Sequence, residues 1–207
     1  PVIGPSQAPI CYNSAPNSLN STTLPTGGGG NFTYQWESST DASVWTPIVG
    51  GTLSNYSPSA QTSSRYYRLK ATSQIGCGPV FSNQIFIQTY PQVVSGAIQN
   101  NQSICYNAVP QILSFSTPTA GGNGTFTYQW QSSANNLTWT DISLANTVSY
   151  QPSALIDTTW FRVKSTSQCG TVYSSPIKIT VFPDFIAGTI GTAQSICHNT
   201  SPNQLAF

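Results

Sequence analysis

One unit of sequence occurs twice in this chain and begins a third time. The octapeptide Phe32–Ser39 returns 94 residues later as Phe126–Ser133, with a single change from Glu37 to Gln131. After a two-residue deletion the spacing becomes 92 residues, and a third copy opens at Gly188. A unit of this length is too large for a solenoid repeat and about right for one sandwich domain. We therefore expect each copy to fold by itself and the 207 residues to be a fragment of a longer array.

Short runs of β-branched and aromatic residues alternate with turn residues in the second copy, which is typical of an antiparallel sandwich. The expected strands are 102–106, 112–116, 125–132, 138–142, 148–151, 159–165 and 176–182. Seven strands and no helix-length amphipathic stretch predict an all-β chain of tandem immunoglobulin-like antiparallel β-sandwiches. The expected domains are repeat 1 at 1–91, repeat 2 at 92–183 and the truncated start of repeat 3 at 184–207.

Charge is scarce in this sequence. Charged residues make up 5% of the chain and the net charge is +1, whereas soluble domains usually carry about 25% charged residues. A net charge this small provides little electrostatic attraction for nucleic acid or for an anionic membrane surface, so neither is expected as a partner. No apolar run approaches the length of about 18 residues that a membrane-spanning helix needs. Abundant hydroxyl and amide side chains, together with 12% aromatic residues, indicate a folded extracellular chain.

Several motifs occur in both complete copies. They are Tyr-Gln-Trp-x-Ser-Ser at 34–39 and 128–133, Trp-Thr-x-Ile at 45–48 and 139–142, Tyr-x-Pro-Ser-Ala at 56–60 and 150–154, and an aromatic pair followed by Arg at 66–68 and 160–162. Together they resemble the tandem Ig-like or PKD-like repeats of SprB-type gliding-motility adhesins, which Bacteroidetes secrete through the type IX system. The resemblance implies a non-catalytic stalk or adhesive segment of a long cell-surface protein. Similar repeats in exported enzymes imply an alternative, a carbohydrate-binding accessory module of a polysaccharide-degrading enzyme.

The five cysteines follow the repeat. Each complete copy has one cysteine on its first strand and one after its sixth, and Cys197 repeats the first of these. If the first strand starts near the loop between the last two strands, the expected disulfides are Cys11–Cys77 and Cys105–Cys169, within single domains. Buried free thiols are the main alternative. Metal ligation is disfavoured because no second Cys or His lies at ligand spacing.

Catalytic groups are sparse. Hydrolysis usually requires paired carboxylates, a nucleophile with a base, or a metal ion. The acidic residues are not kept between the copies: Glu37 becomes Gln131, and Asp41 becomes Asn135. We therefore expect no enzymatic activity, no catalytic residue, no cofactor and no metal site.

The basic residues gather on the expected sixth strands. In each copy Tyr67-x-Leu69 or Phe161-x-Val163 alternates inward, which turns the intervening residues outward. The candidate surface contact comprises Tyr66, Arg68, Lys70, Trp160, Arg162 and Lys164, with Trp139 as a further member. One interpretation is structural: an aromatic ring covers the arginine stem and Glu37 pairs with Arg68. The other is a weak, repeated contact for surface polysaccharide or the substratum, strengthened by multivalency.

The joints between copies are apolar. Tyr90-Pro91-Gln92-Val93-Val94 and Phe182-Pro183-Asp184-Phe185-Ile186 are unlike flexible Gly/Ser linkers. We therefore expect neighbouring repeats of the same chain to touch and to form a stiff, elongated rod.

Overall fold

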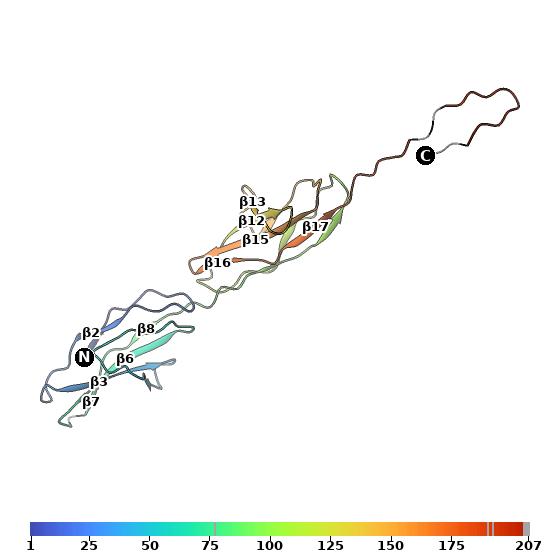
Figure 1. Ribbon diagram of the computed structural model, residues 1–207. Coiled ribbons are helices and arrows are strands. Elements are labelled where there is room, and N and C mark those ends of the chain that lie inside the picture. The colour runs from blue at the N-terminus through green and yellow to red at the C-terminus, as the bar shows by residue number, and fades with distance from the viewer. Residues whose placement is uncertain (77, 190, 192, 205–207) are drawn as a thin grey trace.

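The structure is a computed structural model that describes residues 1–76, 78–189, 191 and 193–204. Two β-sandwiches lie end to end, and the segment after Pro183 continues away from the second one (Figure 1). The described residues contain strands, bridges and turns but no helix, and the two sandwiches have separate hydrophobic cores. The predicted fold class, tandem immunoglobulin-like sandwiches, is confirmed.

The first sandwich pairs a three-stranded sheet with a five-stranded one. The smaller sheet has the order β1-β2-β5, and the larger has the order β4-β3-β6-β7 with β8 also pairing with β6. Their bounds are β1 Val2–Gly4, β2 Leu19–Thr23, β3 Phe32–Ser39, β4 Thr46–Pro47, β5 Asn55–Tyr56, β6 Arg65–Ser73, β7 Pro79–Phe81 and β8 Ile85–Ile87.

The second sandwich repeats this plan. One sheet has the order β14-β11-β9, and the other has the order β10-β17-β15-β12-β13 with β16 also pairing with β15. Their bounds are β9 Ala97–Ile98, β10 Gln102–Ile104, β11 Leu113–Thr117, β12 Thr127–Ser133, β13 Thr140–Asp141, β14 Ser149–Tyr150, β15 Thr159–Ser167, β16 Gly170–Tyr173 and β17 Ile177–Val181. All seven strands expected in this copy are present. Two further strands were not expected: β9, which has only two residues, and β16, which follows a tight turn directly after β15.

A tryptophan lies at the centre of each core. Trp36 and Trp130 are fully buried, and their indole Nε1 groups donate to the carbonyls of Leu53 and Thr147 at 3.0 Å. A buried indole N–H needs such an acceptor. The central strands supply their neighbours by period-two alternation, since every second residue of β6 and β15 faces inward. The same short pattern therefore builds both cores.

The cysteines do not pair as expected. Cys11 of the first sandwich forms a disulfide with Cys169 of the second, and Cys105 is free. The Cys11–Cys77 and Cys105–Cys169 pairings are therefore wrong, and Cys77 itself lies outside the described residues. The expectation failed because it misplaced the first strand relative to the sixth.

Strand direction explains the error. β10 runs parallel to β17, with Ile104 opposite Val181, whereas β15 runs antiparallel to β17, with Thr159 opposite Ile179. Cys105 therefore lies beside the start of β15, and Cys169 lies beyond its end. Eight residue steps of strand separate the two ends, which is about 26 Å. A disulfide requires Cα atoms within about 7 Å of each other, so a bridge inside one sandwich is out of reach.

The linker is also bound to the second sandwich. Val94 exchanges backbone hydrogen bonds with Ala120 at 2.9 and 3.1 Å, and Gly122 N donates to Pro91 O at 2.9 Å. Gly121 lies so close that a Cβ atom there would be 1.9 Å from Gln92 O. The two sandwiches are therefore joined by a linker that is hydrogen-bonded to the second sandwich and by one disulfide.

Candidate functional site

The outward residues of β6 and β15 form an aromatic–arginine face on the larger sheet of each sandwich. Tyr67, Leu69, Phe161 and Val163 are buried, whereas Arg68 and Arg162 are half-buried on the opposite side of their strands. The predicted inward and outward assignment of these strands is confirmed. The neighbouring strands determine how much of each cation remains accessible.

In the first sandwich Arg68 lies between two aromatic rings. Its guanidinium carbon is 4.2 Å from the ring centre of Trp45 and 4.1 Å from that of Phe81. Its Nε donates to Glu37 Oε2 at 2.7 Å, and the side chains of Arg68 and Glu37 are only 20% and 9% exposed. The planar guanidinium suits this position because its faces meet the rings while its edge meets the carboxylate. The expected Glu37–Arg68 pair is confirmed.

In the second sandwich Arg162 has the same contacts as Arg68, but the carboxylate lies one residue further away. Arg162 lies 4.3 Å from the ring centres of both Trp139 and Tyr173, and its Nε donates to Gln131 Oε1 at 2.7 Å. Gln131 Nε2 in turn donates to Asp141 Oδ1 at 2.6 Å. Asp141 is directly across the strand pair from Gln131, at the position that Pro47 occupies opposite Glu37. Each arginine therefore has one carboxylate, reached directly in one domain and through an amide in the other.

The remaining predicted contact residues are also engaged or half-buried. Tyr66 packs against Phe86 with the rings tilted and their centres 4.6 Å apart, and Lys178 Nζ lies 5.2 Å from the ring centre of Trp160. Lys70 and Lys164 are half-buried. The part of the chain that the structure describes contains no ion pair other than Arg68–Glu37.

Sequence reasoning named Trp139 as a member of this face but missed Trp45, Phe81 and Tyr173. The expected cover for each arginine was the aromatic residue on its own strand, whereas the observed covers are Trp45 and Trp139 on one side and Phe81 and Tyr173 on the other. Phe81 and Tyr173 are 45% and 44% exposed and lie on β7 and β16. Both are aromatic residues at corresponding positions of the repeat, and that recurrence was the available signal.

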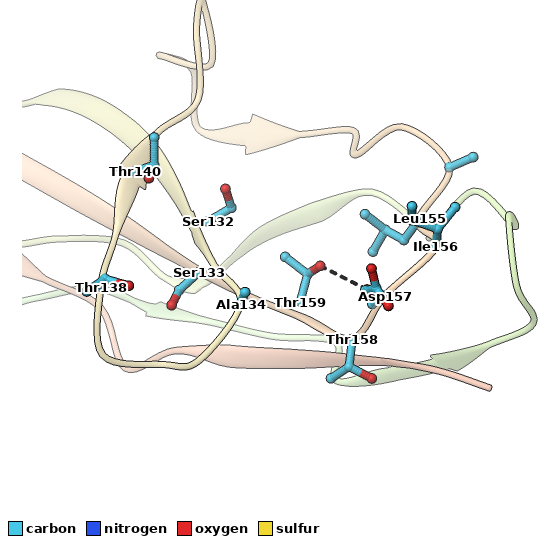
Figure 2. Close-up of a pocket in the computed structure, with 11 residues that line it drawn as sticks. Ser132, Ser133, Ala134, Thr138, Thr140, Leu155, Ile156, Asp157, Thr158 and Thr159 are labelled. Atoms are coloured by element: carbon cyan, nitrogen blue, oxygen red, sulfur yellow. Dashed lines mark hydrogen bonds between the residues drawn. The ribbon is translucent and has the colours of Figure 1, made fainter. Parts of the chain in front are cut away.

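Two open hollows lie near the C-terminal end of the second sandwich. One has a volume of about 490 Å³ between the 132–140 and 154–159 segments, and Figure 2 shows its hydroxyl-rich lining, with Thr159 Oγ1 donating to Asp157 O at 3.0 Å. The other has a volume of about 690 Å³ and includes Tyr106, Trp160 and Asp184. Neither lining includes His, Cys or Glu.

The described ranges offer neither a cluster of metal ligands nor a membrane-spanning helix. Those residues contain no group of three or more His, Cys, Asp or Glu side chains placed to hold a metal ion. They also contain no helix of the length and apolar character needed to cross a membrane.

Comparison with known families identifies the repeat. A family model described as "Domain of unknown function (DUF8696)" matches residues 2–91 and again 94–183. The chain belongs to this family. Each DUF8696 match contains one of the two sandwiches and one aromatic–arginine face. No curated protein is similar enough to the sequence to count as a match.

Solved structures with a similar arrangement are tandem immunoglobulin-like or fibronectin-like modules. The fibronectin(III)-like modules of Clostridium thermocellum CbhA have 9% identity and a TM-score of 0.32, over 88% of this chain and 90% of that one. A domain segment of titin has 15% identity and a TM-score of 0.45, over 82% and 61% of the two chains. The immunoglobulin domains 1–4 of Sidekick-1 have 13% identity and a TM-score of 0.38, over 90% and 48%. These likenesses concern the fold alone.

Proposed function

We propose that the two DUF8696 domains are a non-catalytic stalk or adhesive segment of a long secreted cell-surface adhesin that serves surface attachment and gliding motility. The observation that carries the proposal is the Cys11–Cys169 bond, which joins consecutive sandwiches across their joint. A single linker lets two domains swivel, whereas a second covalent connection at another point opposes bending and twisting. A segment with such joints suits a protein that must transmit force along its length.

The same bond supports export. Structural disulfides form and persist in oxidising compartments such as the periplasm and the cell exterior. The bridge connects positions 158 residues apart, in two different domains. We therefore place this segment outside the cell.

The adhesive part of the proposal rests on the aromatic–arginine face. Each domain presents a half-exposed ring next to its arginine, Phe81 or Tyr173, at the same place on its sheet. Flat rings can stack against the apolar faces of sugars, and repetition along an array multiplies a weak contact. Surface polysaccharide is therefore the proposed ligand class. The same rings favour the second candidate function, a carbohydrate-binding accessory module of a secreted polysaccharide-degrading enzyme.

Intact cells of the organism that makes this protein provide the test. Antibodies against residues 1–183 are expected to label the outside of unpermeabilised cells, and deletion of the gene is expected to reduce both attachment and gliding. A wild-type rate of attachment and gliding in the deletion strain, or labelling only after permeabilisation, contradicts the proposal. Unchanged attachment together with lost growth on a polysaccharide supports the accessory module instead.

Retention on immobilised polysaccharide separates the two functions further. The adhesin predicts retention of long arrays but little retention of one two-domain chain, because each site is weak. The accessory module predicts retention of the two-domain chain itself. In either case Phe81→Ser with Tyr173→Ser is expected to abolish retention, while Leu137→Ser, at an exposed apolar residue of the 134–138 loop, leaves it unchanged.

A further inference from the structure

The turn that carries Cys11 recurs in all three copies. Its cysteine carbonyl accepts a backbone hydrogen bond from the residue three positions later, and the second residue after the cysteine is an asparagine with positive φ. The three cases are Ser14 N to Cys11 O, Ala108 N to Cys105 O and Thr200 N to Cys197 O, each 3.1 Å, with φ of 58°, 59° and 68° at Asn13, Asn107 and Asn199. The turn presents its cysteine at the same place in each copy.

A glutamine fixes the approach to each turn. Its side-chain amide donates to a backbone carbonyl and accepts from the N–H of the same residue, so that the chain is held on both sides of the cysteine. The pairs are Gln7 with Asn17, Gln102 with Gln111 and Gln194 with Asn203, at distances from 2.6 to 3.1 Å. The third copy therefore begins its fold as the first two do.

The other half of the observed bridge is also part of the repeat. Cys169 lies in the turn between β15 and β16 and is followed by Gly170, whose φ of 124° favours glycine. In the sequence Cys77 also precedes a glycine, and its number falls between the last residue of β6 and the first residue of β7. The bond at the joint thus uses the first cysteine of one repeat, Cys11, and the second cysteine of the next, Cys169.

Cys105 lies where Cys11 lies, one domain further on. Phe182 N donates to Ile104 O at 2.9 Å, as Tyr90 N donates to Ile10 O at 2.8 Å. Each cysteine directly follows one of these isoleucines and therefore lies where the chain leaves its own sandwich. Cys105 is exposed and free among the residues that the structure describes. The side chains around it, Tyr106 and Phe182, are also exposed. This end of the second sandwich is thus built like the end of the first sandwich that holds the Cys11–Cys169 bond, but its cysteine is exposed to solvent.

We propose that Cys105 forms a second inter-domain disulfide with the cysteine at the Cys169 position of the repeat that begins at residue 184. The array is then bridged once at every joint. Each bridge forms by thiol–disulfide exchange with a small disulfide oxidant such as glutathione disulfide. Two protein thiols become one protein disulfide, and the oxidant is reduced to two thiols that carry the protons. The occupant of the open end is therefore another copy of this repeat, oriented head to tail.

An array of three complete domains tests this inference. A second copy of residues 92–183 is joined after Pro183. Cys77→Ser is introduced so that the second cysteine of the first domain forms no bond. The protein is refolded in a glutathione redox buffer and mapped without reduction. The expected peptides join Cys11 to Cys169 and Cys105 to Cys169 of the added copy. One thiol per chain, Cys105 of the added copy, then reacts with an alkylating reagent.

The matched control is the same array with Cys105→Ser. It keeps the Cys11–Cys169 bond and is expected to expose two reactive thiols, both in the added copy. The Cys77→Ser array with Cys105 intact overturns the inference if it shows three reactive thiols and the Cys11–Cys169 bond, because the second joint then stays open under conditions that close the first. A bond between Cys105 and any cysteine other than that of the neighbouring turn overturns it equally. Neither result bears on attachment or gliding, so this inference and the proposed function fail separately.

Discussion

Exchanging the charge arrangement of one domain for that of the other tests whether the aromatic–arginine face stabilises the sandwiches. Glu37→Gln gives the first domain the amide found in the second, but Pro47 supplies no carboxylate opposite it. Arg68 would then keep a hydrogen bond and its two rings while losing its counter-charge. Glu37→Gln with Pro47→Asp restores the complete arrangement of Arg162, Gln131 and Asp141.

The structure sets the size of the effect. Exposed ion pairs contribute about 0.2–1 kcal/mol, and breaking a buried pair costs about 3–5 kcal/mol. Arg68 and Glu37 are mostly buried, but the amide preserves the hydrogen bond, so Glu37→Gln is expected to lower the free energy of unfolding of the first domain by about 1–2 kcal/mol. Pro47→Asp alone places a second carboxylate beside Glu37 and is also destabilising. The double variant should lose less free energy of unfolding than the two single variants lose together, and the difference should be about 1 kcal/mol or more.

Hydrogen–deuterium exchange of the full chain, measured by mass spectrometry, reports each domain separately. Peptides from β3 and β6 measure the first domain, and peptides from β12 and β15 serve as an internal control. Asp141→Asn in the second domain is the matched variant and should cost less than about 1 kcal/mol, since Asp141 is exposed. Unchanged exchange of β3 and β6 in Glu37→Gln, or strict additivity in the double variant, would refute the reasoning.

Two further predictions concern the joint and the first core. Gly121→Ala should displace the linker, because the added Cβ would clash with Gln92 O, and should broaden the distribution of interdomain distances in small-angle scattering. The control is Gly27→Ala, because Gly27 has a φ of 81°, close to the 83° of Gly121, but no atom lies within 4 Å of its added Cβ. An identical scattering curve for both variants contradicts this account of the joint. Burial raises the pKa of Tyr67 to about 12, above its ordinary value of 10, so the first domain should lose stability as the pH rises from about 10 through 12. Tyr67→Phe, which copies Phe161, should remove this alkaline loss from exchange profiles of β6, and persistence of the loss would assign it to another group.

The aromatic–arginine face was predictable only in part. Residues on one strand alternate between its two sides, so the sequence places Arg68 and Arg162 outward without reference to the rest of the fold. The rings that enclose them lie on β7 and β16 on one side and immediately before β4 and β13 on the other. β16 was not recognised because its sequence is short and follows a tight turn. Which strand lies beside which is a property of the whole sheet. The ion pair with Glu37 was predictable once an immunoglobulin-like sandwich was assumed, because the antiparallel pairing of β3 with β6 places Glu37 and Arg68 opposite each other.

The sequence by itself determined the repeat, the sandwich class and the inward tryptophans, since these depend on periodicity and on contacts that each copy makes within itself. The cysteine pairing was decided by the tertiary structure alone. The spacing of Cys11, Cys105 and Cys169 fits bridges inside domains as well as bridges between them, because every repeat holds one cysteine of each kind. The parallel pairing of β10 with β17 sends the two cysteines of one domain to opposite ends. A covalent bond forms only between atoms that the fold brings together, and here it brings together the ends of successive domains.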